Sequence, residues 1–511
     1  MKLKKEFKNN VFVFNIASVL FVQILIKIVG TIYNLFLTNN PIYSDSGNGM
    51  FMSVYQIYIL FLTFSIISIP VSISKIVSEK CKNNDDIKKV INSYLFVWGL
   101  IGFLETIIVS VFSGKITENI LRNSDLEIVL DILSVSFIFV NFNAVYRGAL
   151  NGILKTYIGI KIQFLEQILK VLITILGIYL LRVYDFENRE NIIIILALAI
   201  TLSIIAVTFI YKRKLEKNIY SSFQKNKLNE NISYKEVLKD LISISIPITI
   251  LGIFGTINKN IDSLSMISFL KDKFSQDEIS KMYGIIVSKV DTLINLPIGL
   301  NTAITIPLLP KLTKSHREND LNNIRKDIAF SFKLAMMFAI PSMLIYMFFS
   351  KEILNLLYPL ANSGSKSLAL GSVLIVINIV LQIIGVYYNA IRKTMIVIKT
   401  YLLGMIIKVF LNVILVPNEM FLENGILISS IIADVCIIFV LMINYNFRKL
   451  KLDVSDFSLR EIIYKSIFSV LICKVLLKVL ENYIWNFNFL FLICTGISVL
   501  VYILMICFKK H

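Results

Sequence analysis

Long apolar segments separated by short polar ones recur along the whole chain. Because an α-helix rises about 1.5 Å per residue, about 20 apolar residues span the hydrocarbon core of a bilayer. The pattern predicts fourteen such helices, at residues 11–37, 50–74, 90–112, 126–150, 158–181, 191–211, 240–270, 283–310, 328–349, 368–391, 396–416, 425–446, 461–484 and 487–508. We therefore expect an all-α polytopic membrane protein with fourteen transmembrane helices.

The basic residues between the predicted helices test this count. If both termini are cytoplasmic, the cytoplasmic segments hold 34 Lys and Arg residues and the outer loops hold 9. Cytoplasmic loops carry an excess of basic residues in membrane proteins, and a missed helix would exchange the sides of all later loops. The bias thus predicts a multi-pass protein of the cell membrane with both termini in the cytoplasm.

The composition agrees with this interpretation. Hydrophobic residues make up 56% of the 511 residues, and the formal net charge is +18. Since most of this charge lies in the predicted cytoplasmic loops, it indicates topology and not a partner nucleic acid. The five cysteines are scattered and are expected to be unpaired. The basic start and first apolar run resemble a signal peptide, but the run is too long and lacks a small-residue cleavage site, so we expect a retained helix.

Two pairs of similar motifs indicate an internal duplication. Ile69-Pro70-Val71 resembles Ile306-Pro307-Leu308 at an offset of 237, and Val145-Tyr146-Arg147 resembles Val386-Tyr387-Tyr388 at an offset of 241. A six-helix repeat keeps its orientation, so we expect two lobes around an axis along the membrane normal, with the substrate between them. The predicted domains are an N-lobe at 1–212, a basic cytoplasmic linker at 213–239, a C-lobe at 240–446 and a two-helix appendage at 447–511.

Charged residues inside the predicted helices are the candidate functional residues. A charged side chain at the bilayer centre costs about 2.5–3.5 kcal/mol on insertion scales, so it usually faces a water-filled cavity or a partner. We predict that a central cavity between the lobes binds the substrate, and that it is lined by Lys27, Glu105, Lys259, Asp262, Lys289 and Asp291. The alternative for each lysine is a snorkelling or salt-bridged structural residue.

Two further pairs of charges have simpler interpretations. Glu166 and Lys170 stand four residues apart with the acid first, which favours a structural helix pair. Lys474 and Lys478 share one face of the thirteenth predicted helix. They are candidates for lining a groove that binds an anionic lipid, with snorkelling as the alternative.

Nothing in the sequence supports an enzyme. It contains neither a Gly-rich phosphate loop nor a metal-spaced Cys/His cluster, and its histidines are His316 in a loop and His511 at the end. We therefore expect no catalytic residue, metal or cofactor. A lysine-lined cavity favours an anionic passenger, because unit charges 4 Å apart interact by roughly 4 kcal/mol at an effective dielectric constant of 20. An inside-negative potential drives such an anion outward.

A set of short motifs runs in order from the first predicted helix to about the twelfth. It comprises Lys27-Ile-Val-Gly-Thr-Ile-Tyr33, Ser68-Ile-Pro-Val-Ser-Ile-Ser-Lys-Ile-Val-Ser-Glu79, Tyr146-Arg147-Gly148, Glu166-Gln167, Ile261-Asp262-Ser263, Met282-Tyr283-Gly284-Ile285 and Asn295-Leu296-Pro297. As a set, these motifs resemble the stage V sporulation protein B branch of the MurJ-like flippases. That family belongs to the multidrug/oligosaccharidyl-lipid/polysaccharide (MOP) exporter superfamily.

The resemblance implies two six-helix lobes, a cationic central cavity, and a groove formed with the last two helices for a polyprenyl tail. It also implies export of the lipid-linked peptidoglycan precursor lipid II. Lys27 matches the basic first-helix position of the family. The chain departs from the pattern at Asn34, where arginine is expected, and at Met52 and Gln56, where glutamine and proline are expected.

From these observations we expect an alternating-access flippase for an undecaprenyl-diphosphate-linked cell-wall precursor. Lipid II is the first candidate for this precursor. Its expected partners are this anionic lipid-linked substrate, membrane lipids and cell-wall synthesis proteins. Three alternatives stay open. One is a flippase for another polyprenyl-linked oligosaccharide. The second is a cation-coupled drug exporter, which should have a carboxylate in the first helix where this chain has Lys27. The third is a non-transporting scaffold, in which the cavity lysines are dispensable.

Overall fold

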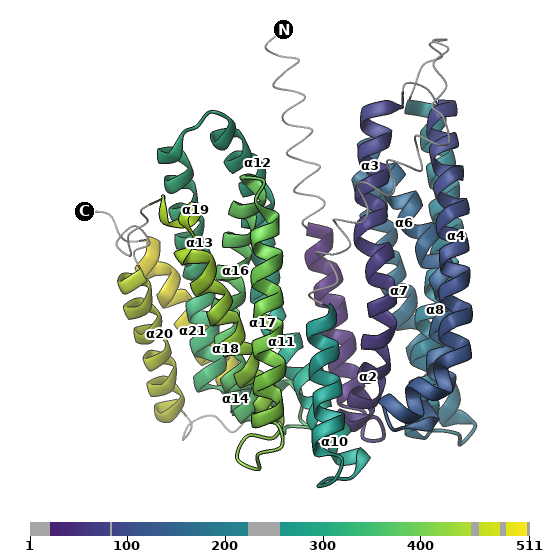
Figure 1. Ribbon diagram of the computed structural model, residues 1–511. Coiled ribbons are helices and arrows are strands. Elements are labelled where there is room, and N and C mark those ends of the chain that lie inside the picture. The colour runs from purple at the N-terminus through teal and green to yellow at the C-terminus, as the bar shows by residue number, and fades with distance from the viewer. Residues whose placement is uncertain (1–20, 82–83, 223–255, 451–458, 481–486, 508–511) are drawn as a thin grey trace. The chain divides into compact units, whose positions relative to one another are not determined.

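The computed structural model describes residues 21–81, 84–222, 256–450, 459–480 and 487–507. In these ranges every regular element is a helix (Figure 1), which confirms the predicted all-α class. The N-terminal elements are a first helix at Phe21–Thr38, α2 (Ser44–Thr63), η1 (Phe64–Ser68), α3 (Ile69–Lys80), α4 (Asn84–Lys115), η2 (Ile116–Ile120), η3 (Ser124–Leu126), α5 (Glu127–Ser134), α6 (Ser136–Gly152), α7 (Thr156–Val183) and α8 (Arg189–Ser222), followed by a helix at 256–270.

The remaining elements are α10 (Gln276–Gly284), η4 (Ile285–Val290), α11 (Asp291–Leu300), α12 (Thr302–Arg317), α13 (Leu321–Phe348), α14 (Ser350–Leu357), α15 (Ser365–Gly371), α16 (Val373–Ala390), α17 (Thr394–Leu415), α18 (Glu423–Ile443), α19 (Tyr445–Arg448), α20 (Leu459–Leu480) and α21 (Phe487–Cys507). Each of the fourteen predicted spans overlaps a helix. Of the helices that the structure describes, ten are long and apolar enough to cross a membrane. That all fourteen cross it stays a prediction.

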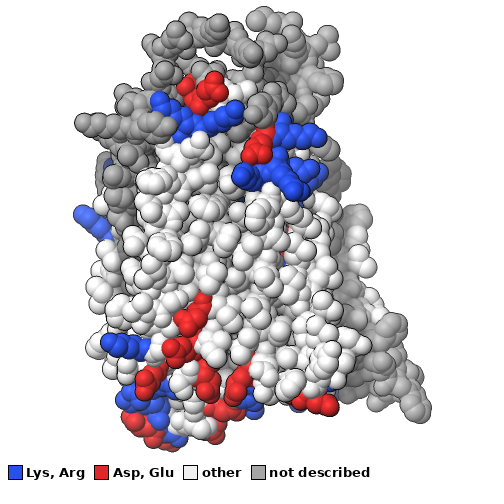
Figure 2. Space-filling view, turned by 90° about the vertical axis from the view of Figure 1, so that its right-hand side faces the viewer, with Lys and Arg blue, Asp and Glu red and all other residues white. Residues whose placement is uncertain are grey.

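The surface has the character of a membrane protein. Figure 2 views the side on which α4 and α8 lie in Figure 1. Most charged side chains on this face gather near its two ends, and a band of uncharged side chains separates them. Such a band suits contact with lipid hydrocarbon. The helix α8 begins at Arg189 and continues to Ser222, past the predicted end of its span. The rest of the predicted linker lies outside the described residues.

The chain packs into two compact units. Among the described residues, unit 1 comprises those at 1–37, 47–267 and 275–280, and unit 2 those at 38–46, 268–274 and 281–511. The short segment Thr38–Ser46 therefore packs with the C-terminal part of the chain. Most of the helix at 256–270 packs with unit 1, although its span was assigned to the C-lobe. This division concerns packing alone, so the internal repeat stays a prediction.

In unit 1, two glycines bring α6 close to α3. A Cβ atom at Gly148 would lie 2.9 Å from the Cα of Pro70, and one at Gly152 would lie 2.6 Å from the Cβ of Val77. The two glycines are four residues apart and so lie on one face of α6. Small residues at this spacing allow helix backbones to approach closely in membranes. The crossing therefore depends on the absence of side chains at these positions.

A proline shapes the same crossing. Pro70 has no N–H, so it cannot donate the α-helical hydrogen bond to the carbonyl of Ile66. Pro70 is the second residue of α3, and the π-helix η1 lies directly before this helix. Arg147, next to Gly148 on α6, donates from Nη2 to the oxygen of Ile66 at 2.7 Å. The arginine thus satisfies the carbonyl that the proline leaves unpaired.

Unit 2 is built around α13, which packs against α12, α16 and α20. The helices α17 and α18 form another close pair, as do α20 and α21. Tyr502 on α21 donates a 2.7 Å hydrogen bond to the carbonyl of Met337 on α13. The predicted two-helix appendage is thus held on unit 2 through α13.

The thiol at the end of α3 should react slowly with alkylating reagents. Burial of the thiol raises the pKa of Cys81 to about 12, and the negative charge of Asp86 contributes to a lesser degree. The thiolate is the reactive form, so Cys81 should be nearly inert at pH 7 and its labelling should rise about tenfold per pH unit up to pH 9. Maleimide labelling followed by peptide mass spectrometry measures this rate. The control is the chain unfolded in SDS, and labelling at pH 7 as fast as in that control would contradict the prediction.

Candidate functional site

Unit 1 contains a polar cavity of about 260 Å³, lined by residues of α2, η1, α6, α7 and α8. We call it the polar cavity. Its hydrogen-bonding and charged side chains from α6 and α7 are Asn143, Arg147, Gln163, Glu166, Gln167 and Lys170. Apolar side chains such as Leu62 and Ile200 form other parts of the wall. The cavity can therefore hold a small group that makes both charged and neutral hydrogen bonds.

The helix α7 supplies most of these polar groups as a stripe. Glu166, Gln167 and Lys170 stand three, four and seven residues after Gln163, which places all four on one helical face. Polar residues within membrane-spanning helices generally face the protein interior or a water-filled cavity. This spacing is the sequence signal that could have revealed the polar cavity. The pairwise interpretation of Glu166 and Lys170 overlooked the two glutamines.

Three charges meet at the polar cavity. Glu166 interacts electrostatically with Lys170 and Arg147. In the part of the chain that the structure describes, however, no ion pair within 4.0 Å joins Glu166 to Lys170. The ammonium of Lys170 instead lies 5.0 Å from the centroid of the Tyr33 ring, a cation–π contact. The Glu166 carboxylate is thus left facing the cavity.

Tyrosines hold the surrounding helices in place. Tyr33 on the first helix hydrogen-bonds Thr174 on α7 through its hydroxyl at 3.0 Å. The hydroxyl of Tyr58 on α2 hydrogen-bonds the hydroxyl of Ser136 on α6 at 2.5 Å. Tyr211 on α8 donates to the carbonyl of Gly159 at 2.9 Å. The contacts of Tyr33 and Tyr211 fix the position of α7 relative to the first helix and α8, and the contact of Tyr58 joins α2 to α6.

Four of the six predicted substrate-binding residues lie in unit 1. Lys27 is exposed on the first helix, Lys259 and Glu105 are partly buried, and Asp262 is buried. The walls of the polar cavity are formed by other residues. The structure therefore does not bring these four to the polar cavity, and their role in binding stays a prediction.

Lys289 lies in unit 2, where a buried acid neutralises it. Its Nζ is 2.7 Å from Oδ2 of Asp45, and the two side chains are 0% and 2% exposed. It also donates to the carbonyl oxygens of Ser363, at 3.0 Å, and of Ala361. Ser363 in turn donates from its hydroxyl to Asp45 at 3.1 Å. The ammonium is therefore enclosed by oxygen atoms from two distant segments.

Gly364 allows the loop after α14 to reach Lys289. Its φ is +98°, a conformation that favours glycine, and a Cβ there would lie 2.4 Å from Cγ2 of Ile285. The carbonyls of Ala361 and Ser363 are thereby held against η4. This geometry matches the alternative of a salt-bridged structural lysine. Asp291 is half-buried at the start of α11, and the role of both residues in substrate binding stays a prediction.

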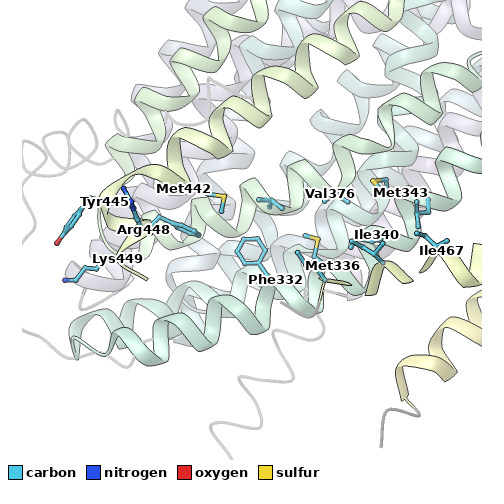
Figure 3. A pocket seen from close by; sticks show the side chains of 15 residues that line it. Phe332, Met336, Ile340, Met343, Val376, Met442, Tyr445, Arg448, Lys449 and Ile467 are labelled. Atoms are coloured by element: carbon cyan, nitrogen blue, oxygen red, sulfur yellow. The ribbon is translucent and has the colours of Figure 1, made fainter. Parts of the chain in front are cut away.

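Unit 2 also contains a large apolar groove of about 1250 Å³, lined by α13, α16, α18, α19 and α20 (Figure 3). Phe332, Met336 and Ile340 on α13 line its length. Arg448 and Lys449 lie together at one end, as Figure 3 shows. We call it the apolar groove. It combines a long hydrocarbon surface with cations at one end.

The predicted groove lysines lie elsewhere. Lys474 and Lys478 are exposed on α20 and are not among the residues that line the apolar groove. They stand 7 and 11 positions after the groove residue Ile467, so they continue the same stripe of the helix. The cations in the wall of the apolar groove are Arg448 and Lys449, which lie shortly after the twelfth predicted span. A role of Lys474 and Lys478 in lipid binding stays a prediction.

Comparison with known proteins identifies the family. Residues 12–316 match the family model described as "Polysaccharide biosynthesis protein", and residues 283–496 match the one described as "Lipid II flippase MurJ". The lipid II flippase MurJ of Bacillus subtilis (strain 168) is 22% identical over 419 residues, which cover 76% of this chain and 74% of that protein. The stage V sporulation protein B of the same organism is 20% identical over 324 residues, 61% of each chain.

Solved structures share the fold. The structure of a lipid II flippase MurJ in an inward closed conformation matches with a TM-score of 0.72 and 18% identity, covering 95% of this chain and 97% of that one. An inward-facing MATE multidrug transporter of the MOP superfamily matches with a TM-score of 0.66 and 14% identity, covering 83% and 95%. The chain resembles the MurJ flippases in part of its sequence and in its fold. Since the polysaccharide biosynthesis model alone matches more than half of the chain, this chain belongs to the polysaccharide biosynthesis protein family, as a multi-pass membrane transporter and not an enzyme.

Proposed function

We propose that this chain is a flippase that moves lipid II from the cytoplasmic to the outer leaflet of the cell membrane. The observation that carries the proposal is the similarity to the B. subtilis lipid II flippase MurJ over 76% of the chain. In this proposal both termini are cytoplasmic, as the distribution of basic residues predicts. The membrane potential then favours outward movement of the anionic head group, by about 2.3 kcal/mol per charge per 100 mV.

The apolar groove supports a substrate with a long hydrocarbon chain. Lipid tails are as apolar as the walls of the groove, so transfer of a tail from lipid into it gains little free energy by itself. The position of the substrate would therefore depend on charged groups. Arg448 and Lys449 at the end of the groove suit a phosphate-bearing head group, because guanidinium and ammonium groups bind phosphate oxygens.

Lys27 provides the first test of this function. In the proposal it contacts the diphosphate, and a hydrogen bond to a charged group contributes about 1.5–3 kcal/mol. We expect Lys27→Ala to slow flipping of lipid II by about tenfold or more, and Lys27→Arg to retain most of the activity. Flipping is measured with purified protein in vesicles that contain fluorescent lipid II, and by growth of a flippase-depleted cell. Lys161→Ala, which removes an exposed lysine from α7, is the control.

The substrate needs a separate measurement. When the protein is depleted from cells that depend on it, an externally added enzyme that cleaves lipid II should lose access to lipid II. Unchanged access would show that the chain flips another polyprenyl-linked molecule or none. Wild-type growth and flipping by Lys27→Ala would remove Lys27 from the proposed binding site. A partner pull-down that survives loss of all cavity lysines, with growth intact, would instead support the scaffold alternative.

A further inference from the structure

The polar cavity is built like a binding site with its hydrogen bonds still available. In the part of the chain that the structure describes, no protein group hydrogen-bonds the side chains of Gln163, Glu166 or Gln167. The Oδ1 of Asn143 is buried and likewise has no hydrogen-bond partner there. Buried or half-buried polar groups are normally paired. The arrangement therefore requires polar atoms from a bound group or from water.

The charges of the polar cavity favour an anion. Arg147 and Lys170 carry two positive charges against the one negative charge of Glu166. A metal ion would be repelled by this net positive charge. A fully ionised phosphate alone offers only acceptors, so it would leave Glu166 facing another anion. A group that carries both an anion and hydroxyl or amide donors would satisfy all three charges.

The size of the polar cavity limits the group further. Its volume of about 260 Å³ lies just below the range of roughly 300–1,000 Å³ that is common for drug-sized ligands. It therefore suits one small part of a larger substrate. The first helix passes beside it, because a Cβ at Gly30 would lie 3.5 Å from Nε2 of Gln167. Lys27 stands one turn before Gly30 on the same helix.

We infer that the polar cavity binds a single acidic sugar unit, a sugar phosphate or sugar carboxylate, with Arg147 and Lys170 on its anion and Glu166 on its hydroxyl or amide donors. This inference rests on the proposed function, since it names the part of the lipid-linked head group that unit 1 recognises. A water-soluble sugar phosphate carries the same chemistry as the lipid-linked head group, so the experiment includes both sources.

The test measures binding of glucose 1-phosphate, glucuronate, glucose and inorganic phosphate to the purified full chain by isothermal titration calorimetry. Lipid II flipping is measured in vesicles in parallel. Glucose 1-phosphate and glucuronate should bind, and glucose and phosphate should bind at least about tenfold more weakly. Lys170→Met and Glu166→Gln should each weaken binding of glucose 1-phosphate by about tenfold. Lys170→Arg should restore it, and Lys161→Met on the same helix should leave it unchanged.

The outcomes separate this inference from the proposed function. Every variant is compared only after gel filtration shows a folded monodisperse protein, and the Lys170→Arg variant guards against loss of folding in Lys170→Met. If lipid II is flipped but the sugar acids do not bind, or bind equally to Lys170→Met, the inference is overturned and the proposed function stands. Binding that depends on Lys170 in a chain that does not flip lipid II would support the polar cavity as a sugar-acid site and overturn the proposed function alone.

Discussion

Replacement of Lys289 with methionine is expected to destabilise unit 2 by about 3–5 kcal/mol, because it leaves the carboxylate of Asp45 buried without its cation. Both side chains lie almost entirely out of contact with solvent, so water cannot replace the lost partner. The hydroxyl of Ser363 would remain as a donor to Asp45, but it carries no charge. The measurement is the temperature at which half of the detergent-purified protein is lost from the monodisperse gel-filtration peak.

Two further variants make this result specific to the ion pair. The double variant with Lys289→Met and Asp45→Asn removes both charges and should recover much of the stability, since removing both partners of a buried pair is far less costly than removing one. Lys366→Met, which removes an exposed lysine from α15, should behave like the wild type. A Lys289→Met variant as stable as the wild type, yet inactive in flipping, would instead favour the predicted contact between Lys289 and the substrate.

Substitution of Gly148 with alanine is expected to destabilise unit 1, although it adds only one methyl group. The added methyl group would lie 2.9 Å from the Cα of Pro70 and 3.0 Å from the Cβ of Ile73, and a backbone atom cannot move aside as a side chain can. Overpacking of this kind typically costs about 1–3 kcal/mol. The strain would also act on the neighbouring Arg147, whose hydrogen bond satisfies the carbonyl of Ile66. We expect less folded protein and weaker ligand binding at the polar cavity.

The chain offers a matched control for this substitution. A Cβ at Gly385, within α16, would have no neighbour within 4 Å. Gly385→Ala should therefore leave stability unchanged or raise it slightly, because alanine is the better helix former by roughly 0.8–1.0 kcal/mol. The measurement is the thermal unfolding temperature of Gly148→Ala and of Gly385→Ala under the same conditions. Equal stability of Gly148→Ala and Gly385→Ala would show that α3 and α6 do not cross as closely as described.

The helices were predictable because their signal is local. Apolar runs of about 20 residues give a helix wherever they occur in a membrane, since the backbone must satisfy its own hydrogen bonds there. The predicted spans accordingly overlap the observed helices throughout the described residues. The packing of Thr38–Ser46 with unit 2 had no such local signal. It depends on contacts such as that of Asn39, which donates to the carbonyl of Leu357 at 2.9 Å.

The candidate site was predictable only in part, for a similar reason. Hydropathy places Lys289 inside a membrane helix but does not reveal that its partner is Asp45, 244 residues away. The polar stripe on α7 was readable from spacing alone. The contribution of Arg147 was not, because it depends on the crossing of α6 with α3 and on the free carbonyl before Pro70. The sequence thus indicates how deep a charge lies, whereas tertiary packing determines which charge it meets.

The link between Asp45 and Lys289 also has a consequence for how the protein is made. Ribosomes add about 5–20 residues per second, so Asp45 leaves the ribosome roughly 10–50 s before Lys289 does. During this interval the carboxylate has no cation to meet, and unit 2 cannot complete its interior until the later segment has been inserted. The segment Thr38–Ser46 therefore waits for the C-terminal half to be synthesised before its acid is neutralised. A C-terminal half expressed alone would have to bury Lys289 without its acid.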